Sequence, residues 1–354
     1  MHVWGEIRGF LPLLLTVLPA WGAAWAWLIS RHGAAAARRT AVINSSLTLA
    51  VALIMAADFL ATGGDQLIGF GVPWLETGPV RMTCSFGVDG LSLWPMVVLA
   101  LAGWTIVLAA ESCCVNWTAS AYAGLLLGQS LGLGIFAAQD FVLYFCCCAG
   151  WSWWSFAAVG RPGGCARRAA AQRYLLISSV GNGLVGIAAT CLVVCQAGMA
   201  RELYGKPGEI SFEFSRMITG LSRSIHSHEI AWEFWSGYQP TVLLFCLGGL
   251  WLRWPMFPWH GWWPAVMSRA RAPMAALFGA ATALQAGYLL FRFIVPFCSD
   301  PGAEWPDWVC WVAAGTVFYA GVLACAQDQL RSLAGYLALS GLATALIAGV
   351  AGTA

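Results

Sequence analysis

The chain has 354 residues, of which 60% are hydrophobic and only 10% are charged. Soluble domains carry roughly 25% charged residues, so this composition excludes a soluble globular protein and a disordered chain and is typical of a polytopic membrane protein. The net charge of +2 gives no indication of nucleic-acid binding. Of the 18 basic residues 17 are arginines, and Lys206 is the single lysine.

Long apolar runs dominate the sequence. A bilayer core about 30 Å thick requires about 20 apolar residues per helix, and runs of this length predict about ten transmembrane helices, the N-terminal run being the first. The runs are continuous, whereas β-barrel strands alternate in character. We therefore expect an all-α polytopic bundle that forms one domain over residues 1–354. The predicted helices are residues 10–29, 42–61, 91–110, 119–138, 141–159, 174–194, 241–256, 272–293, 308–326 and 333–351.

The connections between these helices alternate in charge. Those after the first, fifth and seventh predicted helices contain arginines, whereas those between them carry acidic residues. The positive-inside rule makes the arginine side cytoplasmic, so we expect both termini, and the long loop 196–239, on the outer side. The arginines concerned are Arg31, Arg38, Arg39, Arg161, Arg167, Arg168, Arg173, Arg269 and Arg271.

Cysteine and histidine are the remaining candidates for metal or redox chemistry. The chain has 13 cysteines, including the triplet Cys146–Cys147–Cys148, which could be ligands or, more simply, small apolar packing residues. His226 and His228 form a pair without a third ligand in view. The cysteine spacing does not match an iron–sulfur site, and no dinucleotide fingerprint is present. We therefore expect no metal, no cofactor and no active site within this chain.

The most unusual stretch is RWPMFPWHGWWP, residues 253–264. Pro255, Pro258 and Pro264 predict a break near the end of the seventh helix, beside Arg253 and His260. Broken membrane helices next to ionisable residues recur at ion pathways, and a charge at membrane depth costs about 2.5–3.5 kcal/mol. Arg253 should therefore have a polar partner or a wet cavity, unless it reaches the interface and the prolines only end the helix.

This stretch, with its continuation through residues 273–293, resembles the broken helix 7 and helix 8 of the antiporter-like subunits of respiratory complex I. Within that superfamily, which includes Mrp-type antiporters and membrane-bound hydrogenases, the resemblance is to the subunit M (chain 4) family of NADH:quinone oxidoreductase. Three further motifs agree in order and spacing, and together they cover essentially the whole chain. They are FGVDGLSL at 86–93, DFVLYF at 140–145 and QLRSLAGY at 329–336.

The resemblance implies a function and a setting. It implies a membrane-arm subunit of a complex-I-like NADH:quinone oxidoreductase, with proton translocation coupled to quinone reduction. Its partners would be other membrane subunits and the lipid bilayer, and its location the bacterial inner membrane. The candidate residues of the proton path are Arg253, His260 and Gln285.

The sequence departs from the family where titratable groups are expected. The family uses a glutamate in helix 5, lysines in helices 7 and 8, and a histidine in helix 10. Counting along this chain gives Ala149, Arg253, Leu284 (beside Gln285) and Gly341 at those places. A buried lysine can release a proton, whereas arginine stays charged. We therefore expect a weakened or non-pumping subunit, in which His260 is either a remaining relay or a structural residue of the break.

Other features complete the prediction. Asp89 and Asp140 should cap helix N-termini, and Trp151, Trp153 and Trp154 should fill space that the family keeps hydrated. The chain ends at Ala354, so the family's last four helices would be absent or supplied by a separate chain. The alternatives are a subunit of another assembly (a cation/proton antiporter, a hydrogenase or an inorganic-carbon uptake system) and a scaffold that forms half of a split subunit.

Overall fold

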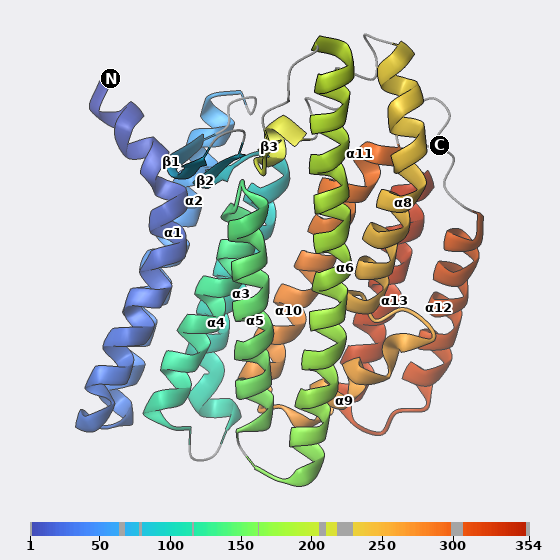
Figure 1. Ribbon diagram of the computed structural model, residues 1–354. Coiled ribbons are helices and arrows are strands. Elements are labelled where there is room, and N and C mark those ends of the chain that lie inside the picture. Colours follow the sequence, from blue (N-terminus) through green and yellow to red (C-terminus); the bar gives the residue numbers. More distant parts are fainter. Residues whose placement is uncertain are drawn as a thin grey trace.

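Long helices run side by side and alternate in direction along the chain (Figure 1). The computed structural model describes residues 2–63, 68–77, 80–114, 117–161, 163–204, 210–217, 229–298 and 307–351. The helices are α1 (His2–Ile29), α2 (Ala34–Ala61), α3 (Gly90–Cys113), α4 (Ala119–Ala137), α5 (Phe141–Gly160), α6 (Cys165–Tyr204), α8 (Glu229–Arg253), α9 (Trp262–Arg269), α10 (Ala272–Leu289), α11 (Val295–Cys298), α12 (Asp307–Cys325) and α13 (Leu330–Ala351).

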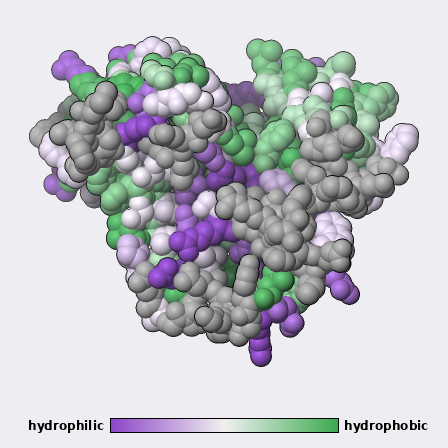
Figure 2. Space-filling model, turned by 90° about the horizontal axis from the view of Figure 1, so that it is seen from above, coloured by the Kyte–Doolittle hydropathy of each residue, from purple (hydrophilic) through white to green (hydrophobic). Residues whose placement is uncertain are grey.

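The all-α membrane bundle is confirmed. Within the described residues, nine helices are long and apolar enough to cross a bilayer. The remaining predicted segment, 241–256, falls in α8, which ends at Arg253. The chain ends marked in Figure 1 lie toward one end of the bundle, and the arginine-bearing connections α1–α2, α5–α6 and α9–α10 lie at the other. At the end that carries the chain termini, hydrophilic side chains gather across the centre of the face (Figure 2).

Several predicted boundaries are wrong, since α1 begins at His2 rather than at residue 10 and α2 at Ala34 rather than at residue 42, and the largest differences concern α6 and α8. Helix α6 has 40 residues rather than the predicted span 174–194, so at 1.5 Å per residue it is about 60 Å long, twice the bilayer core. The predicted loop 196–239 is shortened from both sides, because α6 continues to Tyr204 and α8 begins at Glu229. Hydropathy marks only the part of a helix that lies in lipid, and polar helical turns outside it carry no apolar signal.

A β-hairpin was not predicted. Strand β1 (Ile68–Thr77) pairs antiparallel with β2 (Val80–Val88), and β2 pairs briefly with β3 (Ile210–Ser211). The register shifts between Pro73 and Leu75, where proline cannot donate to the ladder. This small sheet lies at the end of the bundle that carries the chain termini (Figure 1).

Both predicted helix caps are confirmed. Asp89 accepts a hydrogen bond from the Ser92 amide at 3.0 Å and begins α3 with a reciprocal capping box. Asp140 accepts from the Val142 amide at 2.7 Å and begins α5. Each carboxylate satisfies a backbone amide that the first helical turn leaves free. Asp89 also pairs with Arg292, which follows α10 in a π-helical turn (Leu290–Ile294), and Arg292 donates to Oε1 of Gln139 at 2.9 Å.

Candidate functional site at the break after α8

Hydrogen bonds from neighbouring residues satisfy backbone groups in the break that follows α8. Pro255 and Pro258 lie in the irregular segment between Arg253 and the 3₁₀ turn η2 (Trp259–Gly261). The Trp251 indole donates to the Phe257 carbonyl at 3.1 Å, and the Phe257 amide donates to Thr316 of α12 at 3.4 Å. These contacts replace the helical hydrogen bonds that the interruption removes, as burial in a membrane requires.

Pro264 has a different place from the other two prolines. It lies in the first turn of α9 rather than in the break. A first-turn proline lacks only an amide that the helix would leave unpaired anyway. Pro264 therefore belongs to the start of the second half-helix.

Arg253 lies at the end of α8 and points between α5 and α10. Its guanidinium donates to the Tyr144 hydroxyl at 3.1 Å and to Oε1 of Gln285 at 3.3 Å, and it lies 3.6 Å from the Cys148 sulfur. Tyr144, Cys148 and Gln285 are each at most 3% exposed. No ion pair to Arg253 occurs among the described residues. The structure thus brings together the predicted pair Arg253 and Gln285 without a carboxylate.

Close packing of α6 against α8 fixes the position of Arg253. A Cβ atom on Gly249 would lie 2.8 Å from the Gly181 carbonyl oxygen, and one on Gly181 would lie 2.9 Å from Cγ of Arg253. Only glycine permits this approach, which is the way small residues bring membrane helices together. The stem of the Arg253 side chain therefore packs against Gly181 of α6, and its guanidinium reaches partners on α5 and α10.

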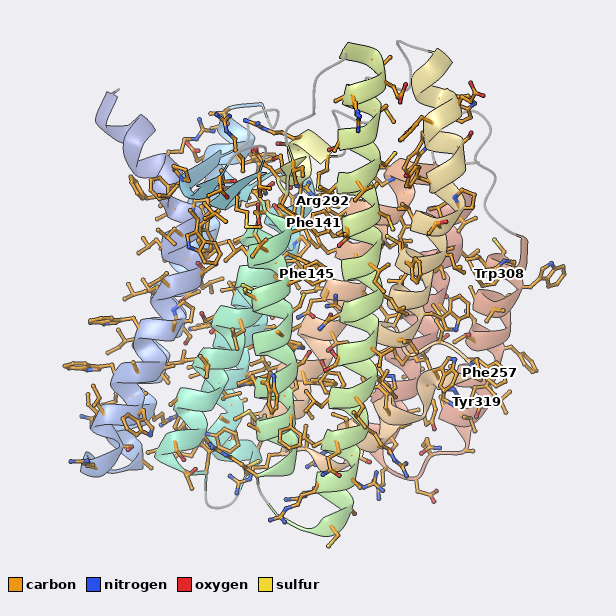
Figure 3. All side chains as sticks on the ribbon, in the orientation of Figure 1. Phe141, Phe145, Phe257, Arg292, Trp308 and Tyr319 are labelled. Carbon is orange, nitrogen blue, oxygen red and sulfur yellow. The ribbon has the colours of Figure 1, made fainter. Side chains whose placement is uncertain are left out.

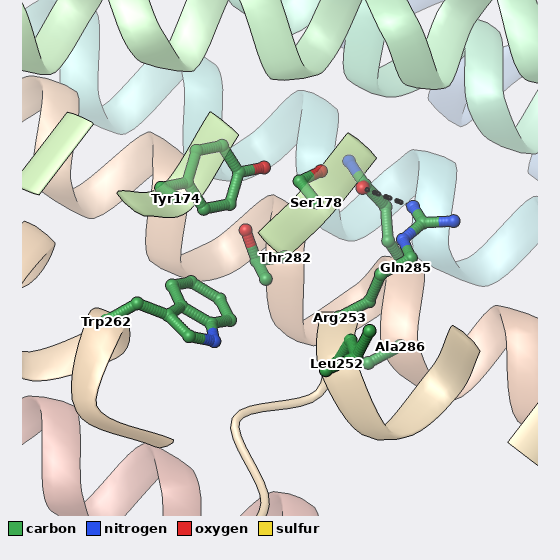
Figure 4. A pocket seen from close by; sticks show the side chains of 8 residues that line it. All are labelled: Tyr174, Ser178, Leu252, Arg253, Trp262, Thr282, Gln285 and Ala286. Carbon is green, nitrogen blue, oxygen red and sulfur yellow. Dashed lines mark hydrogen bonds between the residues drawn. The ribbon is translucent and has the colours of Figure 1, made fainter. Parts of the chain in front are cut away.

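A small polar cavity adjoins Arg253 (Figure 4). Its volume is about 10 Å³, close to the lower limit for one water. The side chains of Tyr174, Ser178 and Thr282 gather there with Gln285. The Ser178 hydroxyl forms a hydrogen bond with the Ser152 hydroxyl at 2.7 Å, and the side-chain amide of Asn182 donates to Oγ of Ser152 at 3.5 Å. This short row of hydroxyl and amide groups can orient a water or pass a proton, but it contains no group that ionises near neutral pH.

His260 lies away from this cluster. Its ring packs 4.8 Å from Tyr319 of α12 and 6.1 Å from Phe257, whereas the partners of Arg253 belong to α5 and α10. Figure 3 shows Phe257 and Tyr319 near each other on the α12 side of the bundle. Nδ1 of His260 has no hydrogen-bond partner among the described residues. The structure therefore does not join His260 to Arg253 and Gln285.

Tyr144 and Cys148 are not among the site residues that the sequence predicts. Counting placed Ala149 where the family has a glutamate, but Ala149 is exposed on the outer face of α5, and Cys148 faces Arg253. Tyr144, Cys148 and Ser152 are spaced by four residues and so share one helix face. That spacing of polarisable and hydroxyl groups was the available signal. Similarly, Gln285 rather than Leu284 faces Arg253.

The tryptophans of α5 do not act alike. Trp151 and Trp154 are buried, and the Trp154 indole donates to the Gly124 carbonyl at 2.7 Å, whereas Trp153 is 63% exposed. Two of the three therefore lie in the interior of the bundle, and Trp153 does not, while the expectation that they replace hydrated space stays a prediction. Lys206, His226 and His228 lie outside the described residues, and the part of the chain that is described contains no group of three metal-binding side chains.

Fold and site together define a polytopic helical membrane protein with a broken helix and a partly buried cation at the break. The family model for the NADH:quinone oxidoreductase/Mrp antiporter transmembrane region matches residues 168–354, more than half of the chain. The chain belongs to this family.

Relatives and solved structures agree with that assignment. The chain is 24% identical over 360 residues to NADH-quinone oxidoreductase subunit M of Escherichia coli K12, covering 96% of this chain and 64% of the relative. It superposes on a chain of respiratory complex I from Thermus thermophilus (TM-score 0.74, 21% identity, 96% of this chain and 65% of that one). It also superposes on a chain of the Mrp complex from Dietzia sp. DQ12-45-1b, with a TM-score of 0.76 and 19% identity, covering 96% of this chain and 34% of that one. The chain thus spans less than two thirds of these relatives.

Proposed function

We propose that this chain is a membrane-arm subunit of a complex-I-like NADH:quinone oxidoreductase. In this subunit the polar residues around Arg253 have a structural role, and proton pumping is weakened or absent. The observation that carries the proposal is the environment of Arg253. A guanidinium stays protonated in proteins and does not release a proton, and its neighbours Tyr144, Cys148 and Gln285 offer no carboxylate to receive one.

The physical contrast is with a lysine–carboxylate pair. A buried ammonium can be shifted toward neutrality by desolvation, and a nearby carboxylate can take or return its proton as the local field changes. A permanently charged guanidinium held by a phenol and an amide can only bias that field. The subunit would then fill and seal the arm, with other membrane subunits of the assembly as partners and the bacterial inner membrane as location.

A second assembly has support from the structural likeness. The chain also superposes over 96% of its length on a chain of an archaeal membrane-bound sulfane sulfur reductase (TM-score 0.71, 20% identity), besides the Mrp chain above. The alternative is therefore a subunit of an Mrp-type antiporter, of a hydrogenase-like or reductase complex, or of an inorganic-carbon uptake system. A scaffold completed by a separate chain with further helices is the third possibility.

Purification of the native complex in mild detergent, followed by mass spectrometry of its subunits, tests the setting. Hydrophilic NADH-binding and quinone-reducing subunits are the expected result. Recovery with antiporter-type or carbon-uptake subunits would replace the first proposal by the second. A short co-purifying membrane protein would support the split-subunit form, and recovery of the chain without any partner would overturn all three.

Proton stoichiometry tests the mechanism separately. We expect inverted membrane vesicles containing the complex to translocate the same number of protons per electron pair whether the subunit carries Arg253 or Arg253→Gln. A lower stoichiometry in intact, fully assembled complex would assign a pumping role to this subunit.

A further inference from the structure

A larger hollow lies at the arginine-bearing end of the bundle, where α4 begins, α5 ends and α10 begins. Its volume is about 330 Å³. Its lining has two parts. Thr118, Ser120, Arg161 and Arg271 are polar or charged, and the remainder is apolar, including Leu127, Trp154, Ala157, Ala158 and Met274. The hollow is therefore amphipathic, and it is separate from the site at Arg253.

The two arginines lack acidic partners. Among the residues that the structure describes, neither Arg161 nor Arg271 forms an ion pair, whereas Arg38 at the same end pairs with Glu111 at 3.0 Å. The Arg271 guanidinium lies 6.0 Å from the centre of the Trp117 ring, a cation–π contact that leaves its hydrogen-bond donors free. Two guanidinium groups beside one cavity, without a carboxylate, form a site for an anion.

The backbone adds to this charge. Helix α4 follows Thr118 and helix α10 follows Arg271, and neither helix start has a side-chain cap. The free amides and positive dipole ends of both helices therefore favour an anion at the polar end of the hollow. The hydroxyl groups of Thr118 and Ser120 hydrogen-bond to each other at 3.2 Å, which leaves one of their two O–H groups as a further donor.

The apolar part extends toward the membrane interior. Leu127 lies eight residues into α4, which corresponds to about 12 Å along the helix, and it is 43% exposed. Ala157 and Ala158 are partly exposed on α5, and their small side chains leave the space that the hollow occupies. A ligand with its anionic group at Arg161 and Arg271 would therefore have a hydrocarbon portion running down this surface.

We propose that this hollow binds an anionic glycerophospholipid. Its phosphate lies between Arg161 and Arg271, and one acyl chain lies over Leu127, Ala158 and Met274. Basic pockets between transmembrane helices on the positively charged side bind lipid headgroups in this way. The proposal does not depend on the assembly to which the chain belongs, since it uses only residues of this chain.

Native mass spectrometry of the full chain in detergent tests the proposal, with phosphatidylglycerol, phosphatidylcholine and inorganic phosphate as probes. We expect phosphatidylglycerol to be retained far better than either of the others. The double variant Arg161→Gln/Arg271→Gln should weaken its binding roughly 30-fold, from two interfacial charges. The matched control Arg31→Gln/Arg39→Gln removes the same charge from exposed positions at the same end and should leave binding unchanged.

A second variant separates a lipid from a free phosphate. Ala158→Trp fills the apolar part and leaves both arginines, so it should reduce phosphatidylglycerol binding without affecting inorganic phosphate. Equal retention of phosphate and phosphatidylglycerol would show a simple anion site. If the Arg161/Arg271 variant and the Arg31/Arg39 control lose phosphatidylglycerol binding equally, the lipid is attracted only by the general positive charge at this end of the bundle. Either result overturns the proposal.

Discussion

The guanidinium of Arg253, at the end of α8, donates a hydrogen bond to Oε1 of Gln285 in α10 at 3.3 Å. This contact joins α8 to α10 at the point where α8 ends. The cation is stabilised by amide and phenol dipoles rather than by an opposite charge. Because a guanidinium does not lose its proton, Arg253 stays positively charged whether or not protons move nearby.

Arg253→Ala should damage assembly more than pumping. The variant loses the contacts to Tyr144 and Gln285 and leaves a void, which should cost about 2–3 kcal/mol of stability. We expect a lower thermal midpoint and less assembled complex, with unchanged proton stoichiometry in the complex that remains. The matched control Arg168→Ala, at an exposed position, should stay within about 0.5 kcal/mol of the wild type. Normal assembly with reduced stoichiometry would contradict the structural role.

His260→Gln should leave coupled turnover within about twofold of the wild type, since the structure does not connect His260 to the Arg253 cluster. A catalytic proton-transfer group contributes about 100-fold or more, so a relay would be visible. NADH:quinone turnover coupled to proton uptake in vesicles is the measurement. A loss of about tenfold with intact assembly would make His260 a relay, and Tyr319→Phe, which retains the ring contact, serves as control.

The two capping carboxylates should respond oppositely to pH. Burial raises the pKa of Asp140 to about 6, with partial compensation by backbone amides, and Glu213 acts in the same direction as burial. The folded protein then binds more protons than the unfolded chain between about pH 4 and 6. Stability should therefore fall by about 2–3 kcal/mol as pH rises through this window. Asp140→Asn, which keeps the cap, should remove the fall.

Asp89 provides the comparison for that experiment. Burial alone would raise its pKa, but the Arg292 guanidinium and hydrogen bonds from Ser92 outweigh burial and hold the pKa below its usual value. Its contribution is present above the unfolded pKa and is lost only as pH falls below about 4. Asp89→Asn should therefore destabilise at neutral pH, by roughly 2–4 kcal/mol for a partly buried pair. Thermal unfolding in detergent at several pH values checks both variants, and parallel pH curves would contradict the assignment.

Gly128→Ala should be poorly tolerated. A Cβ atom there would overlap the indole of Trp154, whose nitrogen donates a hydrogen bond to the Gly124 carbonyl. We therefore expect overpacking to lower the free energy of unfolding by about 1–3 kcal/mol. Gly183→Ala is the matched control, because nothing lies within 4 Å of its Cβ position. It should be neutral or stabilising by about 0.5–1 kcal/mol, the ordinary gain of alanine over glycine in a helix. Equal thermal midpoints would contradict the packing role of Gly128.

Much of the fold could be predicted because a bilayer imposes a length and polarity on each helix. The apolar runs gave the helices, and Asp89 and Asp140 marked the starts of α3 and α5. The parts of the fold that could not be predicted are formed by residues outside the hydrocarbon core of the bilayer. The ends of α6 and the hairpin β1–β2 carry no apolar signal of membrane length, and paired strands derive their stability from partners that are distant in the sequence.

The sequence by itself determined that Lys206 is the single lysine of this chain and that arginine stands at the helix break. It did not determine which residues face that arginine. Successive residues of a helix differ in direction by about 100°, so a count along the chain selected Ala149, whereas packing selected Cys148. Only the tertiary structure decided the partners of Arg253, because the packing of α5 and α10 beside the end of α8 brings Tyr144 and Gln285 within hydrogen-bond distance of the guanidinium.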